Sequence, residues 1–352
     1  MQPALEAKLT SPLLSIAIPT YNRASFLALT LSRLQTDMHT LPADSVEILI
    51  SDNASIDDTA QVIAYYIEKG LCIRSVRNQG NIGSDANIAQ VFNLAKGRYV
   101  LILGDDDILI ANTLGLLIAK LQNETFGVVC VKPFGYDRDI KAEHPGGDGK
   151  DIVFDTAGAF VAAIASYVTL ISACVINKEI LGDVDARTYC GGNLVQVHLV
   201  LRAALKAQRN LYRTRYSVAC KRNNSGGYDF AHVFVEELSK ILDLYGPDGM
   251  TSDQVRRFET RMLLGYYPYY LLRQRRDRSG NVKKTYSYFL NRFHRRLLFW
   301  VWLMPIMKLP RPAAMIWGGA AVLIGRSVTG DLRRGIKFVL IALRRKISKS
   351  HA

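Results

Sequence analysis

Four short apolar runs lie in the first 130 residues, and each is followed directly by a polar loop. The runs cover residues 13–18, 46–50, 72–76 and 99–103. Apolar runs of this length that lack polar alternation are typical of strands buried on both faces of a sheet. The stretches between them carry the apolar spacing of amphipathic helices. This repeated order of strand and helix predicts an α/β fold with a doubly wound, mostly parallel sheet.

The loops that follow the four runs are the candidate binding site. They read PTYNR, SDNAS, RNQGNIGSD and GDDD. In open parallel sheets, ligands bind outside the carboxyl ends of the strands, so the four loops should meet along one edge. A dinucleotide-binding dehydrogenase is excluded, because such an enzyme should carry GxGxxG after its first strand and this chain carries PTYNR.

The chain has 352 residues, about half of them hydrophobic, which is enough for one large α/β domain with an appendage. We expect the α/β domain to span residues 1–240. Its first half, about 13–121, would hold the binding loops, and its second half, 122–240, would complete the sheet. We expect residues 241–352 to form a helical, basic extension.

Three adjacent carboxylates, Asp105, Asp106 and Asp107, follow the fourth apolar run after Gly104. Crowded carboxylates repel one another, and the repulsion grows as water is excluded. A divalent cation relieves it, and aspartate oxygens suit Mg²⁺ or Mn²⁺, which also bind phosphate oxygens. The alternative is a solvated loop that caps the next helix. The position at a strand end, facing three other polar loops, favours the metal site.

The cysteines and the N-terminus indicate a cytoplasmic protein. Five cysteines are scattered without a CxxC pair, which suits a reducing compartment and argues against a zinc site. The N-terminal residues carry no basic segment followed by a long apolar run, so we expect no secretory signal.

Four motifs, in order, resemble those of the family 2 glycosyltransferases, which have the Rossmann-like GT-A fold. They are Ser15–Asn22, Ser51–Asp58, Arg77–Gly83 and Gly104–Asp107, and together they span about a third of the chain. The GDDD form, with Asn81 and Gly83 before Asn87, further resembles the subgroup that contains abequosyltransferases and related O-antigen sugar transferases. The resemblance implies a donor half at 13–121 and an acceptor half at 122–240.

The resemblance also implies roles for the motif residues. Asp106 and Asp107 would hold the metal on the pyrophosphate of a CDP-, UDP- or dTDP-sugar, and Asp105 would face the ribose or the sugar. Asp52 would hydrogen-bond the pyrimidine ring. The rest of the nucleotide pocket would be lined by Pro19, Tyr21, Arg23, Asn81, Gly83 and Asp85.

The catalytic base of an inverting transferase is the point where the chain departs from the family pattern. The family usually supplies an Asp from an acidic pair before a helix, and the matching pair here is Val195–Gln196. Three hypotheses remain open. His198 acts as the base; Asp183 or Asp185 reaches in from the preceding loop; or the reaction retains configuration without a dedicated base. We favour the last, because residues 196 and 198 lie about 200° apart on a helix.

A loop at residues 221–228 combines Lys221 and Arg222 with two glycines. Such a loop is able to close over the donor pyrophosphate and exclude water. The alternative is a surface turn whose cations are solvated, and the sequence does not separate the two.

The C-terminal part is strongly basic. From residue 273 onward, 19 Lys and Arg stand against two acids, while the formal net charge of the whole chain is +14. Its longest charge-free runs, 297–307 and 312–325, fall short of the ~20 residues that a spanning helix needs. Short amphipathic helices with interfacial aromatic residues fit better. We therefore expect peripheral binding to an anionic membrane surface at the inner face of the cell membrane.

The carboxylate cluster and the polar loops predict a metal-dependent enzyme, and the resemblance implies that it transfers a sugar, such as the deoxyhexose abequose, from a nucleotide-sugar donor to a lipid-linked glycan in bacterial surface polysaccharide synthesis. Two alternatives come from other classes. One is a catalytically inactive nucleotide-binding or scaffold protein. The other is a nucleic-acid binder that uses the basic tail, which we disfavour because no nucleic-acid motif is present.

Overall fold

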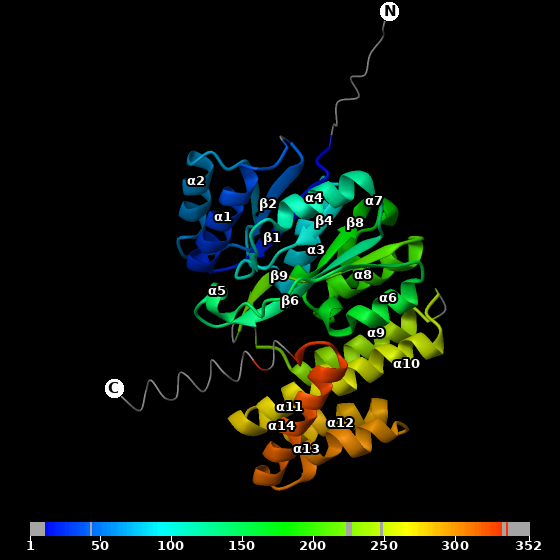
Figure 1. Cartoon of the computed structure of the whole chain (residues 1–352). Helices are drawn as coiled ribbons and strands as arrows, with labels where there is room; N and C mark the ends of the chain where they lie inside the picture. Colours follow the sequence, from blue (N-terminus) through cyan, green and yellow to red (C-terminus); the bar gives the residue numbers. More distant parts are fainter. Residues whose placement is uncertain (1–10, 43, 223–226, 247–248, 333–335, 337–352) are drawn as a thin grey trace, which may run out of the picture.

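A computed structural model describes residues 11–42, 44–222, 227–246, 249–332 and 336. Its centre is a nine-stranded mixed sheet with the strand order β3-β2-β1-β4-β8-β6-β9-β5, and β7 pairs with β9 beside this path. Helices cover both faces of the sheet, and a second layer of helices lies against one end of it (Figure 1). The predicted doubly wound α/β fold is confirmed.

The first half of the sheet is parallel, as expected. Its strands are β1 (Leu14–Thr20), β2 (Val46–Asp52), β3 (Ile73–Arg77) and β4 (Tyr99–Ile102), and they are joined through α1 (Ala24–Met38), α2 (Thr59–Glu68) and α3 (Ser84–Leu94). The prediction of burial on both faces holds for β1, β2 and β4. It is wrong for β3, because this strand forms the edge of the sheet and is half exposed.

The second half of the sheet is antiparallel at its centre. β8 (Cys174–Asn177) runs antiparallel to both β4 and β6 (Val128–Tyr136), and β9 (Asn210–Lys221) runs parallel to β6. The remaining elements of this half are β5 (Ile108–Leu109), α4 (Thr113–Asn123), α5 (Ile140–Glu143), β7 (Asp151–Phe154), α6 (Ala157–Ile164), η1 (Ala165–Thr169), η2 (Ile171–Ala173), α7 (Lys178–Leu181), η3 (Ala186–Tyr189) and α8 (Val195–Lys206).

The C-terminal region is helical wherever it forms regular structure. Its elements are η4 (His232–Glu237), α9 (Leu238–Leu244), α10 (Ser252–Arg261), η5 (Met262–Tyr266), α11 (Tyr267–Asp277), α12 (Val282–Phe293), η6 (Phe299–Leu303), α13 (Met304–Lys308) and α14 (Arg311–Val328). They form the yellow-to-red group of helices below the sheet (Figure 1). No helix among the described residues is long and apolar enough to cross a bilayer.

The C-terminal helices share a hydrophobic core with the sheet. One cluster of buried side chains extends from Ala17 on β1, through Phe160 on α6 and Leu263 on η5, to Ala321 on α14. The helices therefore pack firmly against the α/β layers. The division at residues 240 and 241 stays a prediction, and the basic stretch 337–352 lies outside the described residues.

Candidate active site

The three adjacent aspartates leave the sheet at the carboxyl end of β4, at its centre. β4 is fully buried, and Asp105 and Asp107 are each only 5% exposed. A Cβ on Gly104 would lie 3.1 Å from Oδ2 of Asp107, so the backbone here leaves little room for a side chain. Burial of the strand thus carries the carboxylates into a space from which most water is excluded.

Two side chains from the β1–α1 loop bind the first two aspartates. Thr20 donates from Oγ1 to Oδ2 of Asp105 at 2.8 Å. The guanidinium of Arg23 lies 3.2 Å from Oδ1 of Asp105 and 3.1 Å from Oδ2 of Asp106. The predicted convergence of the PTYNR and GDDD loops is therefore present, and Arg23 balances part of the negative charge.

Asp107 is the aspartate whose charge is least compensated. It accepts a hydrogen bond from the Ser172 hydroxyl, and no cation pairs with it in the described part of the chain. Burial, together with the neighbouring charge of Asp106, raises the pKa of Asp107 to about 7. Burial also raises the pKa of Asp105, to about 6, although Arg23 and Thr20 oppose this rise. Asp107 therefore keeps its proton up to about pH 7, and Asp105 up to about pH 6, unless a cation displaces these protons.

The donor set fits a divalent cation that is completed by ligand oxygens. Among the described residues, the three aspartates do not present three ligand oxygens within 4.8 Å of one another. The assignment of Asp106 and Asp107 as the two protein ligands stays a prediction. Mg²⁺ typically binds through one or two carboxylates together with waters and substrate phosphates.

A pocket of about 580 Å³ opens over these carboxylates. Ten of the predicted site residues line it: Pro19, Tyr21, Arg23, Asn81, Gly83, Asp85, Asp105, Asp106, Asp107 and Lys221. Residues that the sequence analysis did not assign to the site also line it, among them Thr20, Asn53, Thr169, Gln196, Tyr228 and Phe234. Thr20 and Asn53 belong to the predicted loops, whereas Phe234 reaches the pocket from η4 and carried no sequence signal.

Asp52 is buried and is not among the residues that line the pocket. It is 2% exposed, its Oδ1 accepts a hydrogen bond from the Ser55 amide at 2.9 Å, and its Oδ2 lies 3.7 Å from Nε of Arg77. Its neighbour Asn53 lines the pocket and donates to Oδ1 of Asn81 at 2.8 Å. Asp52 therefore shapes its loop in this structure, and its contact with a pyrimidine stays a prediction.

Asp85 joins the donor side of the pocket to the second half of the domain. Its Oδ2 accepts hydrogen bonds from the amides of Gly191 and Asn193, both at 2.8 Å. Its Oδ1 is buried without a hydrogen-bond partner. An unpaired buried carboxylate oxygen beside a polar pocket suits a ligand hydroxyl, such as one from ribose or a sugar.

The two cations predicted to cover the pyrophosphate have different positions. Lys221 lines the pocket, and its ammonium donates to the Asp137 carbonyl. Arg222 is turned away, because its guanidinium pairs with Asp137 at 3.2 Å and with Glu143 at 2.9 Å. The structure does not bring Arg222 to the pocket, and residues 223–226 of this loop lie outside the described residues.

None of the three base candidates lines the pocket. The His198 ring stacks on Tyr189 at 4.6 Å and its Nδ1 lies 3.1 Å from the Tyr245 hydroxyl. Burial, together with the charge of Arg202, lowers the pKa of His198 to about 4. Asp185 caps η3 through the Arg187 amide and also accepts from Asn93, and Asp183 is exposed. The helix geometry that counted against His198 is consistent with this placement.

Gln196 lies in the pocket where the family pattern has its acidic pair. It is 4% exposed, and its Nε2 donates to the Thr169 carbonyl at 2.8 Å. Its Oε1 is buried without a partner. A neutral amide does not accept a proton at neutral pH, but this oxygen is able to accept a hydrogen bond from a ligand hydroxyl.

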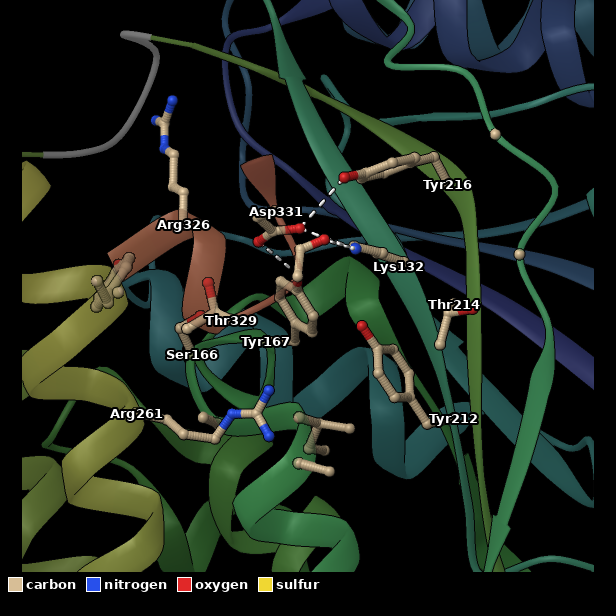
Figure 2. A pocket seen from close by; sticks show the side chains of 18 of the residues that line it. Lys132, Ser166, Tyr167, Tyr212, Thr214, Tyr216, Arg261, Arg326, Thr329 and Asp331 are labelled. Carbon is tan, nitrogen blue, oxygen red and sulfur yellow. Dashed lines mark hydrogen bonds and ion pairs between the residues drawn. The ribbon is translucent and has the colours of Figure 1, made fainter. Parts of the chain in front are cut away.

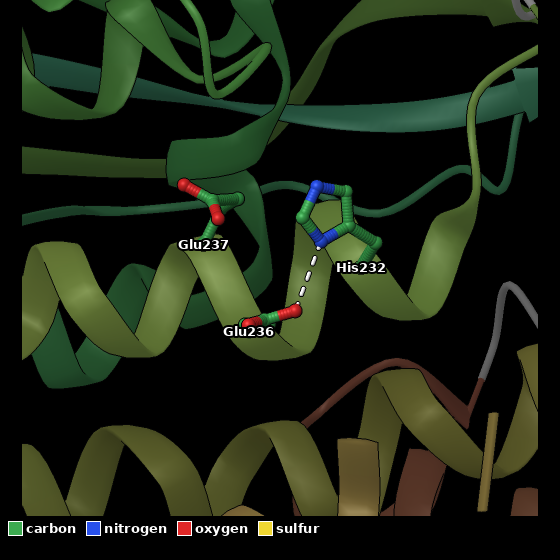
Figure 3. Close-up of side chains that lie close together, drawn as sticks. All are labelled: His232, Glu236 and Glu237. Atoms are coloured by element: carbon green, nitrogen blue, oxygen red, sulfur yellow. Dashed lines mark hydrogen bonds and ion pairs between the residues drawn. The ribbon is translucent and has the colours of Figure 1, made fainter. Parts of the chain in front are cut away.

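A second group of possible metal ligands lies on η4, away from the aspartates. His232, Glu236 and Glu237 present ligand atoms within 4.8 Å of one another (Figure 3). The group is half exposed, and Lys240 already pairs with Glu236 at 3.4 Å and with Glu237 at 2.7 Å. Since Lys240 balances the carboxylates, we assign no metal to this group.

Residues 15–184 match the family model described as Glycosyl transferase family 2. The abequosyltransferase RfbV of Salmonella typhimurium is 35% identical over 119 residues, which cover 34% of this chain and 35% of that protein. A Campylobacter jejuni protein named GalNAc(5)-diNAcBac-PP-undecaprenol beta-1,3-glucosyltransferase is 31% identical over 119 residues, covering 34% of this chain and 37% of that one. The match thus spans little more than a third of the length of these relatives.

Solved structures resemble the chain over most of its length. TarS of S. aureus in complex with UDP-GlcNAc has a TM-score of 0.55 at 15% identity, and the match covers 89% of this chain and 91% of that one. A mannosyltransferase of Pyrobaculum calidifontis in complex with GDP-Man and Mn²⁺ has a TM-score of 0.51 at 17% identity, covering 95% and 88%. These likenesses confirm the GT-A type of fold.

Proposed function

From the match of residues 15–184 to glycosyl transferase family 2, we propose that the chain is a metal-dependent glycosyltransferase that uses a nucleotide-sugar donor. The observation that carries the proposal is the buried, undercompensated Asp107 in a pocket built by four polar loops. A merely structural carboxylate at this depth would be expected to have a cationic partner.

Different residues of the pocket would bind different parts of the donor. Asp106 and Asp107 would hold Mg²⁺ or Mn²⁺, which when bound stabilises the negative charge on the nucleoside diphosphate that leaves. Arg23 orients Asp105 and Asp106 through its two ion pairs. The Asn53–Asn81 contact holds the loop that would face the base and ribose, and Lys221 adds positive charge near the departing phosphate.

We further propose that the reaction retains the anomeric configuration of the donor. Apart from the three aspartates, Asp85 is the carboxylate among the described residues that line the pocket, and one of its oxygens is already bound by two amides. Gln196 stands at the position where an inverting relative should carry its base. In a retaining reaction the departing phosphate accepts the proton of the acceptor hydroxyl, and Oε1 of Gln196 would help to orient the acceptor.

The sugar and the acceptor follow from the relatives' names alone. One relative is named an abequosyltransferase, and the name of another contains a glycan on PP-undecaprenol. We therefore propose transfer of a sugar, such as the deoxyhexose abequose, to a lipid-linked oligosaccharide in bacterial surface polysaccharide synthesis.

Peripheral membrane binding at the inner face of the cell membrane completes the proposal. Helix α14 packs through small residues, since Ala314, Gly318 and Gly325 are buried. Its opposite face carries Ile316 and Leu323, which are 77% and 47% exposed. An ordinary surface helix has a polar outer face, so an apolar outer face in a basic region supports insertion into the surface of an anionic membrane.

A screen of nucleotide sugars tests the proposed activity. The full-length protein would be incubated with CDP-, UDP- and dTDP-sugars and Mn²⁺, and hydrolysis and the melting temperature would be measured. At least one donor should be hydrolysed and should raise the melting temperature, and EDTA should remove both effects. Asp107→Asn should lower turnover by about 100-fold or more, whereas Asp253→Asn on exposed α10 should leave it unchanged. EDTA-insensitive turnover in Asp107→Asn would refute the metal assignment.

A further inference from the structure

A second cavity, of about 430 Å³, lies between the sheet and the C-terminal helices. Its walls come from β6, β9 and η1 on one side and from α10, η5 and the end of α14 on the other (Figure 2). It adjoins the donor pocket through η1, because Ser166 and Tyr167 line this cavity while Thr169 lines the donor pocket. Nothing in the proposed transfer reaction uses it.

One part of the cavity wall contains a buried ion pair between Lys132 and Asp331. Nζ of Lys132 lies 2.8 Å from Oδ1 of Asp331, and both side chains are less than a tenth exposed. The hydroxyls of Tyr167 and Tyr216 donate to the two oxygens of Asp331 at 3.0 and 3.2 Å. The charges of this pair cancel, and its oxygens are satisfied. Asp331 is therefore not available to neutralise another cation in the cavity.

Arg261 is a second cation of the lining and does not belong to this pair. It ends α10, and its guanidinium extends into the cavity (Figure 2). Within the described residues it makes no hydrogen bond and no ion pair. Asp148, the other acid of the lining, lies on an exposed loop. A guanidinium that faces a cavity without a carboxylate partner is a ready site for an anion.

Hydroxyl-bearing residues share the cavity lining with this guanidinium. They are Ser166, Tyr212 and Thr214, of which Thr214 already donates to the Lys150 carbonyl at 3.0 Å, and Arg326 also lines the cavity. The opposite wall is a glycine loop, residues 146–149, in which Gly146 and Gly147 have φ angles of 73° and 94°. A guanidinium with a neutral hydroxyl donor such as that of Ser166 beside the same cavity is the chemistry that recognises phosphate oxygens.

We propose that this cavity is a second binding site, and that it takes a phosphate-bearing ligand held by Arg261. The phosphate belongs either to a small soluble compound or to the head of a lipid-linked molecule, and both present the same group to the guanidinium. The site is separate from the aspartates and needs no metal. This inference goes beyond the proposed transfer and does not depend on it.

Binding to the full-length protein in EDTA tests the proposal, because EDTA keeps phosphates from reaching the aspartates through a metal. The probes are inorganic pyrophosphate and polyprenyl monophosphate in neutral detergent micelles, with polyprenol micelles as the blank, and the readout is titration calorimetry. Arg261→Gln should weaken binding by about 10- to 100-fold, the range expected for one lost charge-assisted hydrogen bond. Arg261→Lys should recover part of it. Arg257→Gln is the matched control, since Arg257 lies on the same helix, is 71% exposed and pairs with Asp253.

The outcomes of the titration separate a soluble from a lipid-linked ligand, and two of them overturn the proposal. Arg261-dependent binding of both probes supports a soluble phosphate compound as the ligand, and Arg261-dependent binding of the micellar probe alone supports a lipid-linked one. Absence of saturable binding by either probe overturns the proposal. Equal affinities of Arg261→Gln and Arg257→Gln also overturn it, provided that their melting temperatures match that of the unmodified protein.

Discussion

At the scale of single residues, burial controls what the aspartates do. Asp107 is 5% exposed, lies next to Asp106 and has no cationic partner among the described residues, and its pKa is raised to about 7. The Asp105 pKa is raised to about 6. Both groups have an ordinary pKa of 3.8. Between about pH 4 and pH 7 the folded protein therefore binds protons that the unfolded chain releases.

This proton uptake predicts the pH dependence of stability in the metal-free protein. The two carboxyls bind protons that the unfolded chain releases, and together they outweigh the opposite effect of His198, whose pKa is lowered to about 4. The free energy of unfolding should therefore fall as the pH rises from about 4 to 7 and level off above 7. Asp107→Asn removes one of the two groups, so its unfolding curve should slope less across this window. Mn²⁺ should reverse the trend, since it binds the deprotonated carboxylates. Urea unfolding from pH 4.5 to 8 in EDTA measures the effect, and equal slopes in both proteins would contradict it.

The position of His198 predicts the result of replacing it. Its ring is stacked on Tyr189, and its pKa is lowered to about 4. His198→Phe should keep the stacking and lower kcat by at most about tenfold, whereas loss of a positioned general base costs about 10²–10⁴-fold. Asp183→Asn should likewise be mild. NMR of the fresh product should show the anomeric configuration of the donor, and an inverted product would defeat the retaining proposal.

Residue identity could be predicted from the motifs, but side-chain direction could not. Arg23 and Lys221 reach the pocket as expected. Arg222, the next residue, instead forms ion pairs with Asp137 and with Glu143, which lies at the end of α5. Asp52 accepts its hydrogen bond from within its own loop. Such choices depend on partners distant in sequence, which the motifs do not contain.

At the scale of elements, strands could be predicted where burial leaves an uninterrupted apolar run. All four runs of the first half form strands, and α2 begins where the Asp57 carboxylate accepts a hydrogen bond from the Thr59 amide. The second half was harder to predict, because β5 is two residues long and β7 has an alternating, half-exposed pattern. The first part of β9, from Asn210 to Arg213, pairs with β7, and the motifs carry no signal for this pairing.

The attachment of α14 to β6 predicts a large effect of breaking one ion pair. Lys132 and Asp331 are buried and 2.8 Å apart, so Lys132→Met leaves a buried carboxylate without its cation. We expect a loss of about 3–5 kcal/mol in the free energy of unfolding. Lys132→Met with Asp331→Leu should recover much of this loss.

The control for this prediction is Lys120→Met. This change breaks a more exposed ion pair between Lys120 on α4 and Glu124, the residue that follows α4. Its expected cost is about 0–1 kcal/mol. Urea unfolding of the four proteins makes the comparison. A Lys132→Met variant no less stable than Lys120→Met would show that the pair does not hold α14 in place.

At the scale of the whole molecule, charge and apolar surface gather in the C-terminal region. This region holds most of the excess of cations, and its exposed apolar side chains include Leu297, Val301, Ile316, Ile324 and Val328. Deleting the region would be a poor test of membrane binding. Arg292 pairs with Asp243 and Glu259, and Phe293 and Phe299 belong to the shared core, so a deletion would also expose that core.

Substitutions on the outer face of α14 test membrane binding without disturbing the core. Ile316 and Ile324 are 77% and 51% exposed and lie within about 80° of each other around the helix axis. Changing both to Asn should lower partitioning onto phosphatidylglycerol vesicles by at least about tenfold, because each inserted side chain contributes on the order of 1 kcal/mol or more. Leu29→Asn on α1, where Leu29 is 50% exposed, is the control and should leave partitioning unchanged.

Salt should weaken binding in all variants, because the cations contribute through screened attraction. Unchanged vesicle binding in the double variant would defeat the membrane proposal, and DNA binding of similar strength that ignores both substitutions would favour the nucleic-acid alternative.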